Sequence, residues 1–333
     1  MYKGRVTAQY KGLYKVLVED TEIISEISGK FRSLVNDVAD YPAVGDFVEI
    51  DRNITGSGNA IIHKVLPRKS MFIRKAAGKE NEIQVVAANM DFVFICMGLN
   101  MDYNLRRLER YISITWSSGA VPVVILTKAD LCDDLFEKIL EVQKISPGVD
   151  IIVTSAVSGE GVSDLEEYLT EGRTVAFLGS SGVGKSTLIN AITGKNLIET
   201  RSTGWEDKGR HTTTRREMYF LESGAAVIDT PGMREIGIED ADISKAFSDI
   251  DELAKECRFK DCSHKNEPGC AVKEAIENGI LDNERLESYF KLKREVKYDG
   301  LNSRQIEKEK ISEMYNDFDG IKNAKKFIKT NKK

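Results

Sequence analysis

Residues 179–186 read GSSGVGKS, and this stretch decides how the middle of the chain folds. An apolar run, residues 174–178, precedes it, and a segment with helical spacing, residues 187–192, follows it. Strand, glycine loop and helix are the context that a phosphate-binding P-loop requires. Because glycines let successive backbone N–H groups turn toward phosphate oxygens, the stretch predicts a nucleotide site. Its candidate residues are Gly179, Ser180, Ser181, Gly182, Val183, Gly184, Lys185, Ser186 and Thr187.

Two side chains of this loop have predicted roles in chemistry. Lys185 is expected to reach the β- and γ-phosphates as a catalytic residue, and Ser186 to hold Mg²⁺. A flexible Gly/Ser loop is the plainer alternative, but it would not account for the flanking strand and helix.

Bulk composition limits the class of protein. A chain of 333 residues predicts two or three domains, and 41% hydrophobic with 30% charged residues is typical of a soluble globular protein. No apolar run approaches the length of a membrane span, and the N-terminus lacks a signal-peptide core. We therefore expect a cytoplasmic protein with no membrane partner. A net charge of −5 implies that any RNA contact uses local basic patches.

The first 70 residues read as short strands at 4–8, 13–18, 21–27, 46–50 and 60–62, separated by Gly, Pro and Asn clusters. This pattern predicts a small closed barrel of the OB type. Such barrels often bind nucleic acid, although a structural or docking module is equally compatible. His63 is expected to be a partly exposed strand residue, and residues 67–75 a basic connector.

Strands and helices alternate from about residue 85 to residue 230. Apolar strands are expected at 91–97, 121–126, 150–153 and 174–178, with helices at 135–145 and 162–169 and another through Leu105 and Ile112. Residues 217–221 and 225–228 flank a turn as a hairpin. The pattern predicts an α/β domain with a largely parallel central sheet.

Polar motifs follow several of these strands, where ligands bind in such sheets. Thr127, Lys128, Ala129 and Asp130 form the motif TKAD. The Asp130 carboxylate can accept hydrogen bonds from N1–H and N2–H₂ of guanine, a donor pair that adenine lacks. The backbone N–H of Ser155-Ala156 is a candidate partner for guanine O6. In the DTPG motif, Asp229 is expected to act on Mg²⁺ through water, and the Gly232 amide to reach the γ-phosphate. Each motif is weak alone, but with a P-loop they indicate a GTPase.

The segment 197–214 has the polarity and length of a mobile switch. Thr213 or Thr214 would supply a second hydroxyl to Mg²⁺, and Thr214 is slightly favoured. Met233 follows DTPG, where many GTPases carry a glutamine that positions water, so another group must act. His211 is the candidate catalytic residue, with an exposed switch histidine as the alternative.

The spacing Cys257-x4-Cys262-x-His264-x5-Cys270 offers three thiolates and one imidazole. A closed set of this kind suits one structural, tetrahedral Zn²⁺, whereas ordinary reduced cysteines are the alternative. The surrounding segment shows little apolar content, so we expect the metal to organise it. Residues 282–296 and 303–315 are expected to be helical. The lysine-rich end either binds phosphates or is a solvated tail.

The motif order is unusual, because TKAD and SA precede the P-loop and DTPG follows it. A regulatory GTPase has the P-loop first, so the order indicates a circular permutation, which a compact domain tolerates. It also places Gly232 directly before the C-terminal region, so that a change in the bound nucleotide could move that region.

The combination of TKAD, GSSGVGKST, residues 209–214 (GRHTTT), DTPGMRE and the cysteine spacing resembles the ribosome-small-subunit-dependent GTPase A family, RsgA or YjeQ. The resemblance covers nearly the whole chain. It implies an OB-fold RNA-binding domain at 1–70, a permuted GTPase domain at 71–240, and a zinc-binding helical domain at 241–333.

The resemblance also implies a function: a late assembly factor of the small ribosomal subunit that hydrolyses GTP to GDP faster on the subunit than alone. The expected partners are GTP, GDP, the subunit and its rRNA, with Mg²⁺ and structural Zn²⁺ bound and the chain monomeric. There are two rival functions. One is another RNA- or tRNA-linked regulatory GTPase, and the other is a nucleotide-gated scaffold without significant turnover.

Overall fold

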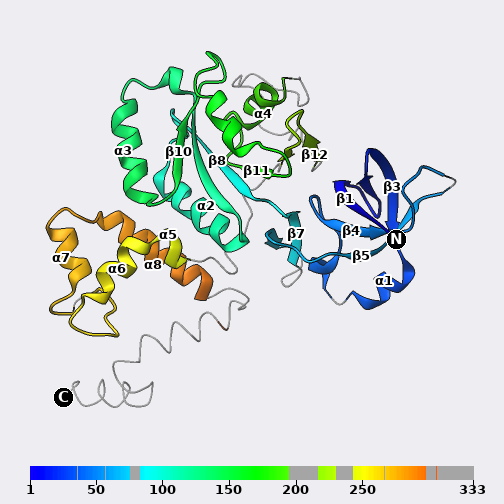
Figure 1. Ribbon diagram of the computed structural model, residues 1–333. Helices are drawn as coiled ribbons and strands as arrows, with labels where there is room; N and C mark the ends of the chain where they lie inside the picture. The colour runs from blue at the N-terminus through cyan, green and yellow to red at the C-terminus, as the bar shows by residue number, and fades with distance from the viewer. Residues whose placement is uncertain are drawn as a thin grey trace.

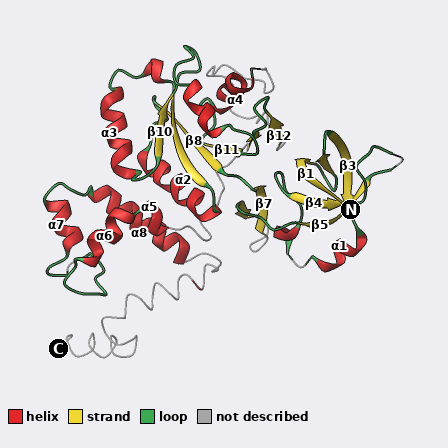
Figure 2. Ribbon diagram, viewed as in Figure 1, coloured by secondary structure: helices red, strands yellow, loops and turns green. Residues whose placement is uncertain are grey.

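A computed structural model describes residues 1–35, 37–56, 58–75, 83–194, 217–229, 243–265 and 267–297, together with Gln305. The N-terminal part is mostly strands, the central part combines strands with helices, and the described C-terminal part is helical (Figure 2). None of the described helices is long and apolar enough to cross a membrane.

The N-terminal part is a closed barrel, as the sequence predicts. Its strands are β1 (Tyr2–Gln9), β2 (Tyr14–Val18), β3 (Thr21–Ile27), β4 (Phe47–Ile50) and β5 (Ala60–Val65). They pair in the order β1-β2-β3-β5-β4, and β4 returns to β1 to close the barrel. Side chains alternate along β2, where Tyr14, Val16 and Val18 point inward. Helix α1 (Gly29–Leu34) and the short helix η1 (Val38–Asp40) connect β3 to β4.

The central sheet has the strand order β10-β9-β8-β11-β13-β12. Its strands are β8 (Phe92–Gly98), β9 (Val121–Thr127), β10 (Asp150–Val153), β11 (Thr174–Leu178), β12 (Glu217–Phe220) and β13 (Ala226–Asp229). All neighbours are parallel except β12 and β13, so the hairpin prediction is also confirmed. Strands β9 and β11 are buried along nearly their whole length, because apolar residues cover both faces of the sheet.

Helices cover the sheet from both sides (Figure 1). They are α2 (Leu105–Ser118), α3 (Leu135–Ile145) and α4 (Lys185–Thr193), with the short helices η2 (Ala129–Leu131) and η3 (Ser163–Tyr168). One core cluster contains Leu108 and Ile112 of α2, and the other contains Leu188 of α4 and Leu165 of η3. The segment predicted as a helix over 162–169 is the 3₁₀ helix η3, which has a tighter turn than an α-helix.

The basic connector predicted over residues 67–75 is partly wrong. Strand β6 (Met71–Lys75) pairs antiparallel with β7 (Ile83–Ala88) in a separate two-stranded sheet. The basic residues obscured the strand pattern, in which Phe72 is buried between the exposed Met71 and the half-buried Ile73.

The C-terminal helices are α5 (Ile243–Ala246), α6 (Ser248–Lys255), α7 (Ala271–Glu277) and α8 (Asn283–Lys297). These helices also supply core residues that the sequence analysis did not identify. Phe247, Ile250, Val272 and Leu286 are buried in the core cluster that also contains Leu108 of α2. Helices α5 and α8 both contact α2, so this region packs on the central domain (Figure 1).

Candidate nucleotide and metal sites

The predicted nucleotide motifs meet at one edge of the central sheet. Because β9, β10, β11 and β13 run parallel, their carboxyl ends lie on the same side. TKAD begins at the end of β9, Ser155 lies just after β10, the glycine loop follows β11, and Asp229 ends β13. The fold therefore brings together motifs that lie far apart in sequence, from Thr127 to Asp229.

The glycine loop connects β11 to α4 in a conformation that only glycine allows at its first position. Gly179 has φ 154°, and a Cβ there would lie 2.5 Å from the carbonyl oxygen of Cys96. Val183 is fully buried in the core cluster beneath α4, which anchors the middle of the loop. The loop leads directly into the N-terminus of α4, whose partial positive charge favours phosphate.

The Lys185 ammonium group folds back over the loop. Its Nζ donates to the carbonyl oxygens of Gly179 and Ser180, both at 2.7 Å. Asp229 is 4% exposed, and burial raises the pKa of its carboxyl group while the nearby charge of Lys185 lowers it. The cation and the carboxylate needed around a nucleotide phosphate and its metal thus lie close together.

The TKAD motif is bonded directly to the glycine loop. The buried Thr127 hydroxyl donates to the carbonyl of Val183 at 2.6 Å, and Lys128 Nζ donates to the carbonyl of Gly182 at 2.7 Å. Lys128 adopts a left-handed backbone conformation, with φ 61°. Threonine, where many GTPases have asparagine, therefore still fixes the loop in this chain.

The carboxylate of Asp130 is held by the next motif. Ser155 Oγ donates to Asp130 Oδ1 at 2.6 Å, and Ser155 is fully buried whereas Asp130 is exposed. The backbone N–H of Ser155 donates to the carbonyl of Glu160, so the N–H of Ala156 becomes the better candidate for guanine O6. This pair presents an oriented carboxylate to solvent beside the glycine loop.

One residue at this edge was missed by the sequence analysis. Asp102, in the loop after β8, accepts a hydrogen bond from Ser180 Oγ at 2.5 Å and pairs with Arg107 at 3.0 Å. The available signal was its position, because this loop also follows a strand of the parallel sheet. It carries no recognisable motif.

Several predicted residues lie outside the part of the chain that the structure describes. They are His211, Thr213, Thr214 and Gly232, together with Met233. Their predicted roles stay predictions.

The four predicted metal ligands lie together between α6 and α7. One ligand atom from each of Cys257, Cys262, His264 and Cys270 lies within 4.8 Å of the others. His264 Nδ1 is 3.6 Å from Cys257 Sγ and 3.4 Å from Cys270 Sγ, and these two sulfurs are 3.9 Å apart.

These separations fit a tetrahedral metal. Zn–S bonds of about 2.3 Å and a Zn–N bond of about 2.0 Å put two sulfurs roughly 3.8 Å apart and sulfur and nitrogen roughly 3.5 Å apart. Burial raises the pKa of Cys257, but hydrogen bonds from the backbone N–H groups of Val272 and Ala271 outweigh it and lower the pKa overall. The N-terminus of α7 thus favours a thiolate, which is the form that binds metal.

The strand order and the glycine loop define the class: a P-loop nucleotide-binding protein in which the base-recognition motif precedes the phosphate loop. The RsgA GTPase family model matches residues 65–239. The small ribosomal subunit biogenesis GTPase RsgA 2 of Lactiplantibacillus plantarum is 47% identical over 98% of this chain and 91% of that protein. The small ribosomal subunit biogenesis GTPase RsgA of Methanosarcina acetivorans is 44% identical over 93% of this chain and 85% of that protein.

Solved structures agree with this class. YjeQ from Thermotoga maritima matches with a TM-score of 0.66 at 31% identity, over 89% of this chain and 98% of that one. YloQ, described as a circularly permuted GTPase, matches with a TM-score of 0.62 at 25% identity. The match covers 89% of this chain and 95% of that one. The chain belongs to the RsgA GTPase family.

Proposed function

We propose that this protein hydrolyses GTP to GDP and phosphate as a maturation factor of the small ribosomal subunit, in the cytoplasm and as a monomer. The observation that carries the nucleotide part is the direct bonding of TKAD to the glycine loop through Thr127 and Lys128. It couples base recognition to phosphate binding. The subunit as partner is supported by the names of relatives that match 98% and 93% of the chain.

In this proposal, Asp130 is the residue that selects the base. Its carboxylate, oriented by Ser155, would accept from N1–H and N2–H₂ of guanine, while the N–H of Ala156 would donate to O6. A site built for such pairing rejects the wrong base by roughly 10⁴-fold, because mismatched groups stay unpaired. Asp130→Asn should therefore lose its preference for GTP and gain affinity for xanthine nucleotides. Equal affinity of the unmodified protein for ATP and GTP would refute the assignment.

Phosphate binding falls to the loop 179–187 and to Lys185, whose bonds to the carbonyls of Gly179 and Ser180 would be exchanged for phosphate oxygens. Ser186, Thr214 and Asp229 would hold Mg²⁺, which supplies charge neutralisation on the phosphates when bound. Gly232 would donate its N–H to the γ-phosphate.

His211 would orient the attacking water, since Met233 cannot. Without a positioned helper, P-loop GTPases turn over on the order of 10⁻³ per second or less, so the free protein should be slow. The decisive experiment measures GTP turnover with and without small subunits. His211→Ala should keep GTP affinity and subunit binding but lose most of the stimulated rate. Stimulation equal to that of the unmodified protein would make His211 a bystander.

This experiment also separates the rival functions. A scaffold without turnover would bind GTP and subunits without hydrolysis, and a GTPase linked to another RNA would be insensitive to small subunits. We further propose that Cys257, Cys262, His264 and Cys270 hold a structural Zn²⁺, and that the domains divide near residues 70 and 240. The metal would fix the loop between α6 and α7, and elemental analysis should find one Zn²⁺ per chain.

A further inference from the structure

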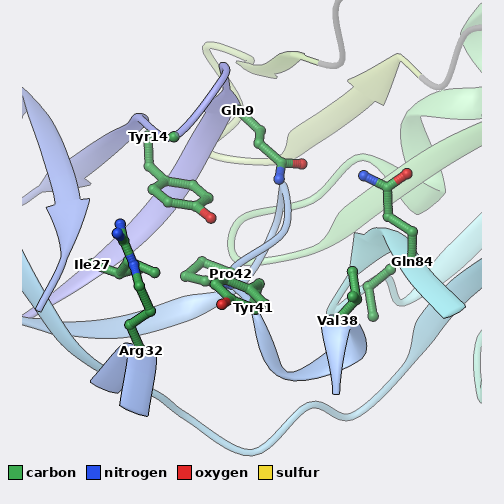
Figure 3. A pocket seen from close by; sticks show the side chains of 10 residues that line it. Gln9, Tyr14, Ile27, Arg32, Val38, Tyr41, Pro42 and Gln84 are labelled. Atoms are coloured by element: carbon green, nitrogen blue, oxygen red, sulfur yellow. The ribbon is translucent and has the colours of Figure 1, made fainter. Parts of the chain in front are cut away.

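A small pocket lies where the barrel meets the β6–β7 sheet, far from the nucleotide motifs in sequence. It encloses about 310 Å³, at the lower end of the range for small-ligand pockets. Gln9 and Tyr14 line it from β1 and β2, Arg32 from α1, Tyr41 from the segment after η1, and Gln84 from β7 (Figure 3). Two phenol rings, two carboxamides and one guanidinium group therefore surround one space.

The walls of this pocket are held in place. Arg68 donates to the carbonyl of Tyr41 at 2.9 Å and to that of Ala39 at 2.6 Å, which fixes the segment carrying Tyr41. On the other side, Val85 packs with Ala43 and Ala88 in a small buried cluster. The pocket is therefore part of the folded joint and not a gap between loosely attached parts.

The polar groups of the pocket are suited to a ligand that both donates and accepts. Tyr14 is 5% exposed, and burial raises the pKa of its hydroxyl, which stays neutral; the side chain of Gln9 hydrogen-bonds to it. Arg32 is exposed and forms no ion pair with any described residue. The nearby carboxylates of Asp37 and Asp40 accept from backbone N–H groups of their own turn.

This combination matches one chemical class. Carboxamides pair with the edges of nucleobases, aromatic rings stack on their faces, and arginine binds the attached phosphate. A base within a double helix cannot enter a concave pocket of this size, whereas an unstacked base can. An extended peptide is a poorer match, because the barrel strands that line the pocket, β1 and β2, are already paired with each other and with their neighbours.

We propose that this pocket binds a single unstacked base of an RNA chain, with Tyr41 stacking on the base, Gln9 and Gln84 contacting its edge, and Arg32 binding the adjacent phosphate. The inference rests on the proposed function, because it names the contact that the barrel makes with an RNA partner.

The test measures binding of short single-stranded oligoadenylate and oligouridylate to the full-length protein. Tyr41→Ala, Gln84→Ala and Arg32→Ala should each weaken binding, with Tyr41→Ala the most severe at about tenfold or more. Tyr41→Phe should keep most of the affinity, because stacking survives. Lys30→Ala is the matched control, since Lys30 is exposed on the same helix as Arg32 but does not line the pocket.

Two further arms make the outcome decisive. An oligomer without bases should bind the unmodified protein and Tyr41→Ala equally, and thiouridine in the RNA should photocrosslink to the peptides carrying Tyr14 or Tyr41. Wild-type affinity in all pocket variants would overturn the proposal. So would tight binding of free adenosine or uridine monophosphate, which would make this a site for free nucleotides. Because no ribosomal subunit is used, failure here leaves the subunit-stimulated GTPase test independent.

Discussion

The barrel and the C-terminal helices are both attached to the GTPase domain, but by different means. All buried residues of the barrel's own core cluster lie between Val6 and Ile62. Within residues 243–297 as described, the C-terminal helices have no cluster of their own, since Phe247, Ile250 and Leu286 share theirs with α2 of the GTPase domain. The barrel is therefore a self-contained unit, whereas the C-terminal helices extend the core of the GTPase domain.

Polar contacts reinforce this difference. The guanidinium group of Arg285, on α8, is 2% exposed and donates to Asp249 and Glu109 and to the carbonyls of Ile145 and Ala246. These partners span the GTPase domain and the C-terminal helices, so the two regions are fixed to each other. Nucleotide-driven movement of the C-terminal helices would have to carry Arg285 and its partners along.

The joint at the barrel is built from other contacts. Gly45, at φ 93°, approaches so closely that a Cβ would lie 2.1 Å from the carbonyl oxygen of Ala88. Arg5 donates to Thr174 Oγ1 at 2.7 Å, at the start of the P-loop strand, and Ala8 pairs with Glu217 of β12. Val44 is buried in the same core cluster as Phe72 and Val86, so the joint is partly apolar. The barrel's own core cluster does not include Val44, which should let the barrel keep its fold without the GTPase domain.

The largest expected effect comes from separating the parts. A fragment of residues 1–69 should fold alone, with cooperative melting, because it keeps its closed barrel and its core. A fragment beginning at residue 241 should stay unfolded even with Zn²⁺, because it loses the apolar partner supplied by α2. Circular dichroism and amide NMR dispersion of both fragments measure this. A folded C-terminal fragment would remove the distinction between the two attachments.

Removing the arginine clamp comes next. Arg285→Ala should cost about 3–5 kcal/mol, because it leaves Glu109 and Asp249 without their shared partner. Glu109 is 1% exposed and would retain its pairing with Arg106 and a hydrogen bond with the side chain of Ser288. Amide exchange in α6 and α8 should then accelerate by about 100-fold or more, while barrel exchange stays unchanged.

Arg285→Lys is the matched variant for this test. It keeps the charge but loses the planar group that contacts both carboxylates, so it should recover only a minor part of the protection. Full protection in either variant would show that apolar packing alone holds the C-terminal helices.

Much of this fold was predictable because the local signals agreed with the tertiary outcome. The strands Thr21–Ile27 and Asp150–Val153 and the helix Leu135–Ile145 have the bounds that the sequence predicts. Hairpin β6–β7 was missed because charged residues sit within short strands. The packing of the C-terminal helices was missed because no single helix has enough apolar residues to indicate a core, and the buried face appears only when they meet α2.

The site was predictable wherever a motif carries its own chemistry, as in the glycine loop and in the cysteine and histidine spacing. Asp102 was not, because its role depends on the distance to Ser180, 78 residues away in sequence. The same holds for Arg285 and Glu109, which look like ordinary surface charges in the sequence but lie buried together.

A smaller effect is expected from removing the metal. Because apolar contacts with α2 persist, chelation or Cys262→Ser should expose the loop between α6 and α7 to protease while α8 keeps its amide protection. Elemental analysis before and after chelation should show that the loop becomes sensitive to protease only when the metal is lost. Cys132→Ser is the control, since Cys132 lies outside the metal cluster. Loss of protection in α8 would mean that the metal, and not the shared core, organises the whole region.

The smallest effect is expected at the barrel joint. Arg5 is largely buried, and burial lowers its pKa to about 10 against the opposing charges of Asp91 and Asp46, so the group still carries its charge near neutral pH. Arg5→Met should cost about 1–3 kcal/mol, because the charged hydrogen bond to Thr174 and two longer ones to the carbonyls of Gly45 and Asn89 are lost while the apolar stem is kept.

The Arg5→Met effect should be confined to the joint. Proteolysis should increase around Asn89 and Thr174, while the barrel core between Val6 and Ile62 keeps its protection and the metal loop is unaffected. Lys15→Met, which removes an exposed ion pair with Glu22, is the control and should change stability by less than about 1 kcal/mol. If Arg5→Met instead lowers amide protection throughout the barrel, then the barrel depends on the GTPase domain as the C-terminal helices do. The two attachments would in that case differ only in degree.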